Sequence, residues 1–480
     1  MLRDSTFSCD AAVDDAAVGS GWVDEHLLAG PGDRVCLWFD QPVTRAALRE
    51  LVAERCKELA GTGLSAGGSV SLQLPPGLTY VVNLLAAWRL GAQVSLLDHR
   101  LTPYEAERAM GVIQPQLLVS PAGEIPKHLL RGYTSVTAGI TPRDGQPAAT
   151  GHALLQLSSG STGPSKVIGR TAADLLTEID RYRHLEGYPR PGERIVLLAS
   201  MVHVLGLVGG LLYGLAADVT LMVPAFLTTK DILAAVTAAP EPTTILGVRF
   251  HIDLLASDDS PPELPQLARV IVGGEVVPPR TVRSFAGKYP TVPLGIMYGM
   301  TEVGVIATDL RGEHRPALVT APGMVLRAED GQLMIARPCT PYVGSAAPGR
   351  WVDGWLRTKD AGTVDPDTGL VTVTGRLDSQ VSVAGLKVDL ADVEQTLVEL
   401  PGVTEAVVLF NGGIDAYLAV AAGRTAEEIA GELTGQLAAY KRPQRLYLLP
   451  KLPRTASGKV VRDLSVLRAA VQNSQLPDPL

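Results

Sequence analysis

Near the start of the chain, apolar and polar positions follow patterns that predict helices and strands in turn. Thr44 is expected to cap a helix running to Leu59, because apolar side chains recur there at helical spacing. Those side chains are Leu48, Leu51, Val52, Cys56 and Leu59. A strand is predicted at 70–74, a helix at 78–90 and another strand at 93–97. Such alternation is typical of a layered α/β sheet.

The alternation continues through the middle of the chain. A helix is predicted at 172–185, and strands at 195–199, 243–246, 268–272, 293–297, 331–336 and 370–374. We therefore predict the α/β fold class, with a large N-terminal domain of layered α/β sheets at residues 1–377.

The end of the chain reads as a second, smaller domain at residues 378–480. Its expected elements are helices at 390–400 and 425–437 and strands at 406–410 and 417–421. Together they form an α+β unit of about a hundred residues, an ordinary size for a small domain.

One stretch, 195–217, is long enough to cross a bilayer and has no formally charged residue. His203, four glycines and a β-like start instead favour a buried strand followed by a helix. We therefore expect no membrane insertion.

Composition narrows the classes of function. The 480 residues are 46% hydrophobic and 19% charged, with a net charge of −8, so a general nucleic-acid surface is not expected. Cys9, Cys36, Cys56 and Cys339 show no metal-binding spacing and favour a reducing compartment. The N-terminus lacks the basic start and apolar run of a signal peptide. A cytoplasmic protein is therefore predicted.

The loop L-S-S-G-S-T-G-P-S-K at 157–166 carries the first candidate chemistry. Glycines, hydroxyls and Lys166 offer backbone N–H groups and one cation to a polyphosphate. A P-loop needs glycine directly before its lysine, whereas Ser165 stands there, so the Walker pattern fails. Taken alone, the loop could equally be a Gly/Ser surface turn.

Four more motifs follow this loop along the chain. They are Y-G-M-T-E at 298–302, G-W-L-R-T-K-D at 354–360, G-R-L-D at 375–378 and P-R-T-A-S-G-K at 453–459. Together, in this order, the five motifs resemble those of the adenylate-forming superfamily, over about residues 41–463. That superfamily comprises acyl- and aryl-CoA synthetases, the adenylation domains of peptide synthetases, and luciferases.

The resemblance implies a nucleotide site. The leaving phosphates would be held by Ser158, Ser159, Gly160, Ser161, Thr162, Gly163 and Lys166. Thr301 would contact the α-phosphate and Glu302 would ligate Mg²⁺, which prefers oxygen ligands. Tyr298 would stack on adenine, Asp360 would accept both ribose hydroxyls, and Arg376 would support the ribose. The simpler alternatives are a capped helix start at Thr301–Glu302 and a solvated surface carboxylate at Asp360.

The small domain would supply the moving parts. By resemblance, Lys459 places its ammonium between the carboxylate and the α-phosphate, and Asp378 is the hinge about which the domain rotates after the first step. The rotation would withdraw Lys459 and bring the loop near Gly385 to the site as part of a thiol channel. Glycine suits a pantetheine arm passing close to backbone.

The acid pocket is expected around His203, whose side chain lines it in the family, although a core histidine bonded to a backbone carbonyl is the alternative. No acidic residue stands nearby to pair with an amino group, which favours a plain carboxylic acid. Small residues suggest room for a bulky or ring-bearing acid, namely Gly206, Gly247, Gly274 and Gly299. These glycines may equally be tight turns.

At three positions the sequence departs from the family pattern. Ser165 separates Pro164 from Lys166, Lys359 replaces the glycine usually found before the ribose aspartate, and Ser379 replaces an acidic residue after the hinge. None removes a charge that adenylation needs, so they affect loop geometry and the second step most.

The predicted activity is an AMP-forming acyl- or aryl-CoA ligase that uses ATP, Mg²⁺ and CoA. The alternative is a stand-alone adenylating enzyme that loads a carrier protein's phosphopantetheine. Lys441, Arg442 and Arg445 could receive either the CoA phosphate or an acidic carrier. A luciferase-type oxygenase is a further alternative. A non-catalytic nucleotide-binding relative is expected to lack Lys459, Glu302 or Asp360, and all three are present.

Overall fold

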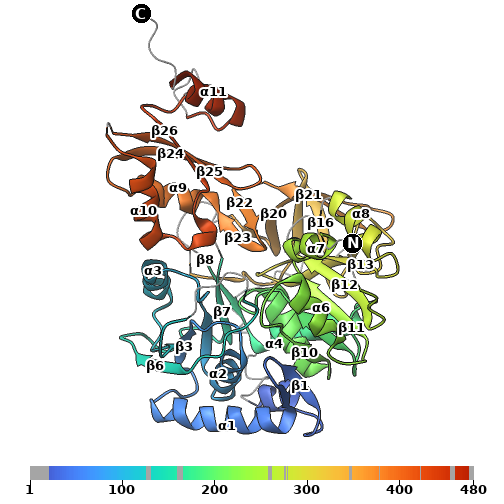
Figure 1. Ribbon diagram of the computed structural model, residues 1–480. Coiled ribbons are helices and arrows are strands. Elements are labelled where there is room, and N and C mark those ends of the chain that lie inside the picture. Colours follow the sequence, from blue (N-terminus) through green and yellow to red (C-terminus); the bar gives the residue numbers. More distant parts are fainter. Residues whose placement is uncertain are drawn as a thin grey trace, which may run out of the picture. The chain divides into compact units, whose positions relative to one another are not determined.

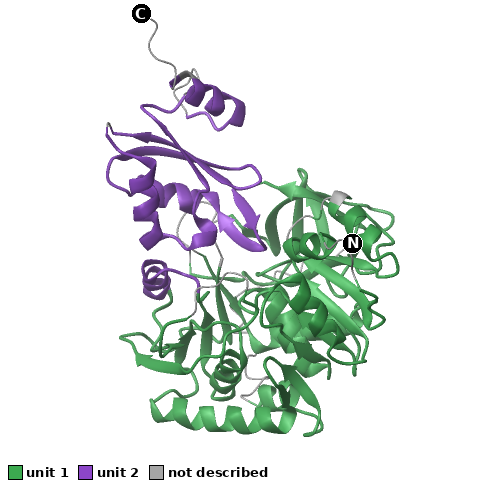
Figure 2. Cartoon of the chain, in the orientation of Figure 1, with its two compact units in different colours: residues 1–99, 113–158, 166–377 green, residues 100–112, 159–165, 378–480 purple. Residues whose placement is uncertain are grey.

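The computed structural model describes residues 21–125, 131–158, 166–257, 262–274, 277, 279–344, 349–377, 379–421, 423–453 and 460–474. These residues form two compact units (Figure 2). Unit 1 contains described residues up to 377, except 100–112. Unit 2 contains residues 100–112 together with the described residues after 378.

The predicted N-terminal helix is α1, Arg45–Gly61. The Thr44 hydroxyl caps it by accepting a hydrogen bond from the Ala47 amide at 3.2 Å. Leu48, Val52 and Leu59 are buried, but Leu51 is 36% exposed. Leu51 was therefore wrongly assigned to the buried face, because the helix packs along a narrower stripe than its apolar pattern suggests. Three other helices share a core with α1: η2 (Val23–Leu27), α2 (Leu78–Arg89) and α4 (Ala172–His184).

A seven-stranded sheet in unit 1 has the order β18-β8-β7-β4-β3-β5-β6. Its strands are β3 (Ser69–Leu72), β4 (Gln93–Leu96), β5 (Leu117–Pro121), β6 (Ala138–Pro142), β7 (Leu154–Ser158), β8 (Lys166–Arg170) and β18 (Tyr342–Val343). Strands β5, β3, β4 and β7 run parallel, and β8 returns antiparallel to β7. The candidate phosphate loop therefore joins two adjacent strands of this sheet.

A nine-stranded sheet has the order β15-β14-β13-β12-β11-β9-β10-β1-β2. Its strands are β1 (Val35–Trp38), β2 (Pro42–Thr44), β9 (Arg194–Leu197), β10 (Thr220–Met222), β11 (Thr243–Gly247), β12 (Leu267–Gly273), β13 (Leu294–Met300), β14 (Gly304–Asp309) and β15 (Val319–Thr320). Helices α6 (Thr229–Thr237), α7 (Arg249–Ala256) and α8 (Pro279–Lys288) accompany it (Figure 1). Ile232, Ile252 and Phe285 of these helices share a core with Val270 of the sheet.

The third sheet of unit 1 holds two of the motifs. It has the order β16-β17-β20-β19, with β21 paired to β20. Its strands are β16 (Leu326–Glu329), β17 (Gln332–Ala336), β19 (Trp351–Val352), β20 (Trp355–Val364) and β21 (Val371–Arg376). Leu333, Ile335 and Leu356 pack in one core with Ile306 of β14 and Ile168 of β8. This core therefore packs the third sheet against β8 and β14 of the other two sheets.

The uncharged stretch at 195–217 is divided as expected. Strand β9 is followed by a π-helix, η3 (Leu205–Leu212), and a short helix, α5 (Tyr213–Ala216). Among the residues that the structure describes, no helix has the length and apolar character required to traverse a bilayer.

Unit 2 has a three-stranded sheet, β24 (Val403–Phe410), β25 (Ile414–Val420) and β26 (Arg445–Leu449), in that order. Its other elements are β22 (Gln380–Val383), β23 (Leu386–Asp389), α9 (Leu390–Val398), α10 (Ala426–Gln436), η4 (Ala439–Lys441) and α11 (Leu464–Ser474). Leu397 and Leu433 of α9 and α10 share one core with Leu418, whereas Leu467 of α11 shares another with Tyr417. Neighbouring residues of a strand face opposite sides, so these helices cover opposite faces of the sheet.

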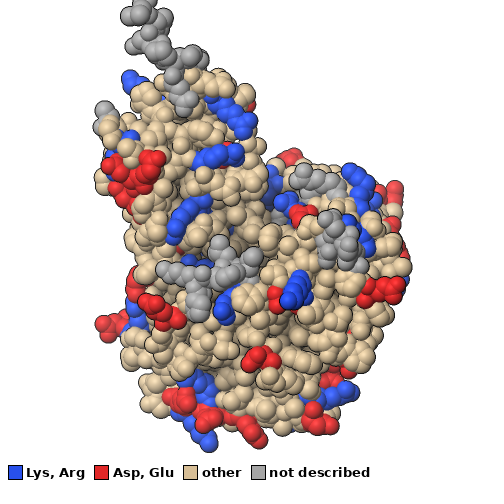
Figure 3. Space-filling view, viewed as in Figure 1, with Lys and Arg blue, Asp and Glu red and all other residues tan. Residues whose placement is uncertain are grey.

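Unit 2 also includes helix α3, Pro103–Ile113, which lies between β4 and β5 in the sequence. Figure 2 shows it in the colour of unit 2. On the face of the molecule in Figure 3, acidic and basic side chains are scattered among a larger area of other residues.

Candidate active site

Asp360 is the centre of a buried polar cluster in unit 1. It lies on β20 directly opposite Arg376 of β21, and is 4% exposed. The Arg376 guanidinium donates to Oδ1 at 2.9 Å, and the Tyr298 hydroxyl donates to Oδ2 at 2.6 Å. Burial and the Asp360 charge raise the pKa of Tyr298, so its hydroxyl keeps its proton. A solvated surface carboxylate is therefore excluded, and three predicted nucleotide residues lie together.

The backbone just before Asp360 is in an unusual conformation. Lys359, at the position where the family usually has glycine, has a φ of +63°. Residues other than glycine, asparagine and aspartate rarely adopt this left-handed region. Lys359, in place of the usual glycine, therefore carries a side chain at a positive φ, which strains the backbone locally.

Thr301 and Glu302 lie in the tight turn between β13 and β14, which pair antiparallel. The alternative of a capped helix start is therefore wrong. Glu302 is 6% exposed. The Tyr342 hydroxyl donates to its Oε1 at 2.9 Å, and the Arg350 guanidinium lies 3.6 Å from the same oxygen.

Tyr342 and Arg350 were missed by the sequence analysis. Tyr342 is on β18, which pairs with β8 beyond the candidate phosphate loop, and the Arg350 Nε lies 3.2 Å from its hydroxyl. Burial and the neighbouring Glu302 raise the pKa of Tyr342, so it remains a hydrogen-bond donor. No sequence pattern links these residues to Glu302, because sheet pairing brings them together.

Glu302 fits a site in which Mg²⁺ has one protein ligand. Tyr342 and Arg350 hold the Glu302 carboxylate through Oε1. The described residues contain no group of three or more His, Cys, Asp or Glu that could hold a metal. Mg²⁺ commonly uses one or two carboxylates plus substrate phosphates, so this single carboxylate is sufficient.

The candidate phosphate loop is described only at its two ends. Ser158 ends β7 and Lys166 begins β8, and the two residues pair across the antiparallel strands. Ser159, Gly160, Ser161, Thr162 and Gly163 lie outside the described residues. Their roles stay predictions.

A buried ion pair supports the Thr301–Glu302 turn. Arg170 of β8 donates to Glu178 Oε2 of α4 at 2.8 Å, and the Val305 amide donates to Oε1 at 3.2 Å. A side chain at Gly304 would collide with the Glu178 carboxyl, so the turn packs directly on it. Burial raises the pKa of Glu178, and Arg170 opposes that effect. This support was also missed.

The predicted acid-binding residues are distributed around strand ends of unit 1. The His203 amide bonds to the Ser200 carbonyl at 3.2 Å, just before η3. A Cβ at Gly206 would lie 2.3 Å from the Ser200 oxygen, and one at Gly299 would lie 2.6 Å from the Gly304 oxygen. Close backbone packing thus accounts for glycine at both positions. Their place in an acid pocket stays a prediction.

Gly247 and Gly274 differ from each other. A Cβ at Gly247 would lie 3.0 Å from Nδ1 of His251, a buried side chain of α7. At Gly274, which has a φ of +89°, the nearest heavy atom to a Cβ would be a Val248 methyl at 3.8 Å. Of the four glycines, Gly274 has the widest clearance from the residues that the structure describes.

In unit 2, Lys459 and Asp378 lie outside the described residues, and their roles stay predictions. Gly385 has a φ of +81° and Ala384 a φ of +49° in the two-residue turn between β22 and β23. Such a hairpin turn needs positive φ at both positions, which explains the glycine independently of a thiol channel.

Described residues close to Lys459 in the sequence are firmly held. Arg462 makes two hydrogen bonds to Glu394 of α9, at 2.7 and 2.6 Å. The Val408 amide of β24 also donates to Glu394, at 2.8 Å. The segment that follows Lys459 is therefore anchored to α9 and to the edge of the sheet.

The predicted basic rim of unit 2 already has partners within that unit. Lys441 pairs with Glu105 at 2.7 Å, and Arg445 with Asp415 at 2.6 Å. Arg442 donates to the Leu437 carbonyl at 2.7 Å. Lys441, with a side chain 14% exposed, is less accessible to a ligand than Arg445, at 46%.

Comparison with protein families gives a match in two parts. Residues 24–333 match the model of the AMP-binding enzyme family, and residues 392–459 match that of the AMP-binding enzyme C-terminal domain.

Known relatives match most of the chain. A p-hydroxybenzoic acid–AMP ligase of Mycobacterium tuberculosis is 25% identical over 88% of this chain, which spans 66% of that relative's length. 4-Coumarate–CoA ligase 5 of Oryza sativa is 27% identical over 96% of both chains. A double mutant of o-succinylbenzoate CoA synthetase from Bacillus subtilis has a TM-score of 0.78 at 21% identity, covering 92% of this chain and 97% of that one. The last likeness confirms the predicted fold class.

Proposed function

Because the chain belongs to the AMP-binding enzyme family, we propose that it activates a carboxylic acid with ATP and transfers the acyl group to coenzyme A. Membership confirms the predicted superfamily and an enzyme that forms AMP. The observation that best supports the nucleotide role is the buried cluster of Tyr298, Asp360 and Arg376. A buried carboxylate held by a phenol and a guanidinium presents fixed acceptors to a ribose diol.

The proposed reaction has two steps. In the first, a carboxylate oxygen attacks the α-phosphorus of ATP, the bond to the β-phosphate breaks, and pyrophosphate leaves with its electrons. In the second, the CoA thiol loses its proton and attacks the acyl carbonyl carbon, and AMP leaves as the thioester forms. Both anions of the first step repel each other, so positive charge and N–H donors must offset the charge of the transition state.

In unit 1, different residues would bind different parts of ATP. Asp360 would orient the ribose and Thr301 the α-phosphate, while Tyr342 and Arg350 hold Glu302 in place. Mg²⁺, bound by Glu302 and the phosphates, would neutralise phosphate charge. In unit 2, Lys459 would supply the ammonium for the first step, and Gly385 would border the thiol channel in the second.

We propose a ring-bearing acid as the substrate. The relatives act, by their names, on p-hydroxybenzoate, 4-coumarate and 4-chlorobenzoate, which are all ring acids. Among the described residues, the nearest heavy atom to a Cβ at Gly274 would be 3.8 Å away, which supports room for a ring. His203 is the proposed polar side chain of this pocket.

A second candidate function is acid adenylation followed by loading of a carrier protein. The relative named as an acid–AMP ligase favours it, and that relative is longer than this chain. Both functions use the same first step, so only the thiol acceptor distinguishes them.

The test is pyrophosphate release across a panel of carboxylic acids, with and without CoA. We expect release with benzoate- or cinnamate-like acids, and an acyl-CoA product when CoA is added. Activation of acetate or propionate alone would reject the ring-acid proposal. An acyl-AMP that reacts with a phosphopantetheinylated carrier and not with CoA would establish the second function.

A further inference from the structure

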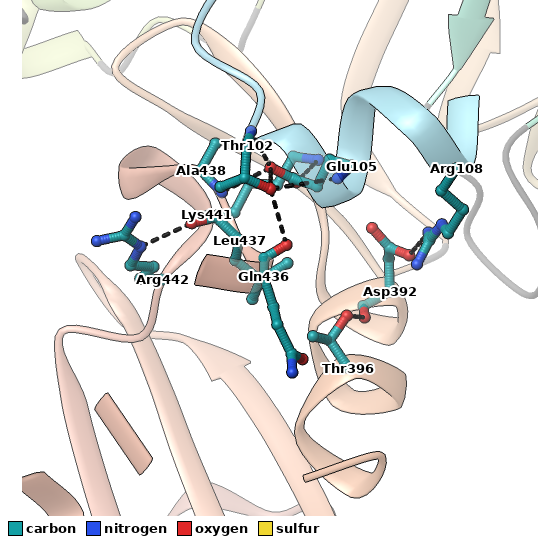
Figure 4. Close-up of polar contacts among 10 residues, drawn as sticks. All are labelled: Thr102, Glu105, Arg108, Asp392, Thr396, Gln436, Leu437, Ala438, Lys441 and Arg442. Atoms are coloured by element: carbon teal, nitrogen blue, oxygen red, sulfur yellow. Dashed lines mark hydrogen bonds and ion pairs between the residues drawn. The ribbon is translucent and has the colours of Figure 1, made fainter. Parts of the chain in front are cut away.

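Helix α3 is bound to the C-terminal part of unit 2 through one buried carboxylate. Figure 4 shows Thr102, Ala438 and Lys441 converging on Glu105. The Lys441 ammonium lies 2.7 Å from Glu105 Oε1, and the Ala438 amide donates to Oε2 at 2.8 Å. The Glu105 and Lys441 side chains are only 7% and 14% exposed. The charge-assisted contacts are therefore shielded from water and stronger than those of a surface ion pair.

Glu105 also organises the start of α3. The Thr102 amide and hydroxyl both donate to Glu105 Oε2, at 3.0 and 3.1 Å, and the Glu105 amide donates to the Thr102 hydroxyl at 3.2 Å. This is a capping box, with Pro103 in the favoured first helical position. The carboxylate is therefore fixed before it meets its partners from the C-terminal part.

Three further contacts join α3 to the C-terminal part of unit 2. Arg108 forms an ion pair with Asp392 of α9, and the Thr102 hydroxyl lies 3.3 Å from the Gln436 carbonyl (Figure 4). The Arg100 guanidinium lies over the Tyr440 ring, 5.5 Å from its centre. Helix α3 thus contacts α9 and the segment that follows α10.

The chain ties α3 to strands of unit 1. Residues 97–102, six in all, join the end of β4 to α3, and residues 114–116, three in all, join α3 to β5. In adenylate-forming enzymes, the C-terminal domain rotates between the two steps. A helix held by two short connections cannot follow such a rotation, so its contacts would break.

The contacts of α3 lie on one side of the C-terminal part. Helices α9 and α10 and the β22–β23 hairpin share the core on one face of the sheet. Leu452 and Val460, which flank the Lys459 segment, share the core on the other face. On α9 itself, Asp392 contacts Arg108, while Glu394, two residues on and so facing away from it, holds Arg462.

We propose that Glu105 is a positioning residue for the second step: its contacts with Lys441 and Ala438 hold the C-terminal domain in the orientation for thiol transfer. Helix α3 contacts α9, which shares a core with the β22–β23 hairpin, whereas Leu452 and Val460 pack in the core on the other face of the sheet. A contact made in one orientation and broken in the other shifts the balance between them. This proposal rests on the two-step function proposed above.

The test is Glu105→Gln, measured on each step separately. Glutamine retains the capping box and an acceptor for the Ala438 amide, so mainly the ion pair is lost. We expect CoA transfer from supplied acyl-AMP to slow at least about fivefold, the lower end of typical coupling between two states. ATP–pyrophosphate exchange should be unchanged or faster.

Variants of the partner sharpen the result. Lys441→Met should reproduce the loss, Lys441→Arg should retain most of the transfer rate, and Glu105→Gln with Lys441→Met should be no worse than either alone. The matched control is Glu432→Gln, which breaks the Arg424–Glu432 ion pair of α10, outside the α3 contact. It should leave the ratio of the two rates unchanged.

The outcomes separate this proposal from the proposed function. Equal slowing of both steps by Glu105→Gln, no change in either, or loss of adenylation alone would overturn it. A wild-type protein that releases no pyrophosphate with any acid would instead reject the function itself.

Discussion

Two buried glutamates, one in each unit, have nearly the same surroundings. Glu178 of unit 1 accepts the Val305 amide at 3.2 Å and the Arg170 guanidinium at 2.8 Å. Glu105 of unit 2 accepts the Ala438 amide at 2.8 Å and the Lys441 ammonium at 2.7 Å. Each carboxylate thereby joins a helix to a segment that is distant in the sequence.

The difference is in what each carboxylate joins. Glu178 is fully buried, and its partners belong to strands of unit 1 itself, beside the Thr301–Glu302 turn. Glu105 retains slight exposure, and its partners belong to the domain that is proposed to rotate. The same chemistry can thus make a permanent support in one place and a contact that can be released in another. The predictions below test that difference.

The largest effect is expected for Glu178→Ala. It would leave the Arg170 charge and the Val305 amide buried without their acceptor, so unfolding should become easier by roughly 3–5 kcal/mol. Both half-reactions should fall together, in contrast to Glu105→Gln. Denaturant unfolding and the two rate assays would measure this.

The control for Glu178→Ala is Glu186→Gln. Glu186 pairs with Arg311 at 2.6 Å, but its side chain is 75% exposed. Such a pair contributes little, so stability should hardly change. A cost as large as that of Glu178→Ala would show that burial is not the cause.

A pH effect is expected from His251 of unit 1. Burial lowers its pKa to about 4 from 6.5, because removal from water disfavours the charged ring. The neutral ring accepts the Val248 amide at 3.2 Å. The folded pKa is below the unfolded one, so the stabilisation is complete above pH 6.5 and is lost as pH falls toward 4. His251→Gln should therefore gain up to roughly 3 kcal/mol relative to wild type across this window.

Unfolding followed from pH 7 to 4 would check this prediction. Only the transition of unit 1 should respond, which would also identify that transition when Glu178 and Glu105 variants are compared. A constant difference between variant and wild type at all pH values would contradict the assignment.

A smaller, local effect is expected for Tyr342→Phe. The variant removes the donor to Glu302 Oε1 and leaves the fold support of Glu178 intact. Adenylation should slow about tenfold, the cost of one hydrogen bond to a charged group. The Mg²⁺ concentration for half-maximal rate should rise, while CoA transfer and thermal stability stay near wild type. Equal loss of both steps would indicate a structural role instead.

The smallest effect is expected for Lys359→Gly. Glycine relieves the strain of the positive φ at this position but makes the unfolded chain more flexible, so the net gain should be about 0.5–1 kcal/mol. Lys359→Ala keeps the strain and serves as the control. Thermal unfolding would measure both variants, and a gain for alanine equal to that for glycine would contradict the strain.

Local patterns predicted most elements to within a few residues. The helix expected at 78–90 is α2, Leu78–Arg89, and the strand expected at 243–246 is β11, Thr243–Gly247. Periodicity succeeds here because each element buries a continuous face. It failed for Leu51, because α1 packs along a narrower stripe than its apolar pattern suggests.

The motifs identified the candidate site residues, but not how they are held. Tyr298 was expected to stack on adenine, and Asp360 and Arg376 to hold the ribose. The structure brings the three side chains together. Their mutual hydrogen bonds follow from the pairing of β20 with β21 and could not be predicted from spacing. The same holds for Tyr342 beside Glu302.

By itself, the sequence determined the order of elements, the motifs of an AMP-binding enzyme and the residues that carry its charges. Only the tertiary structure decided which charges are buried together, as in Glu178 with Arg170 and Glu105 with Lys441. Local patterns report on neighbours within a turn or a strand. A contact between segments hundreds of residues apart depends on the order of strands and the packing of helices, which no local pattern contains.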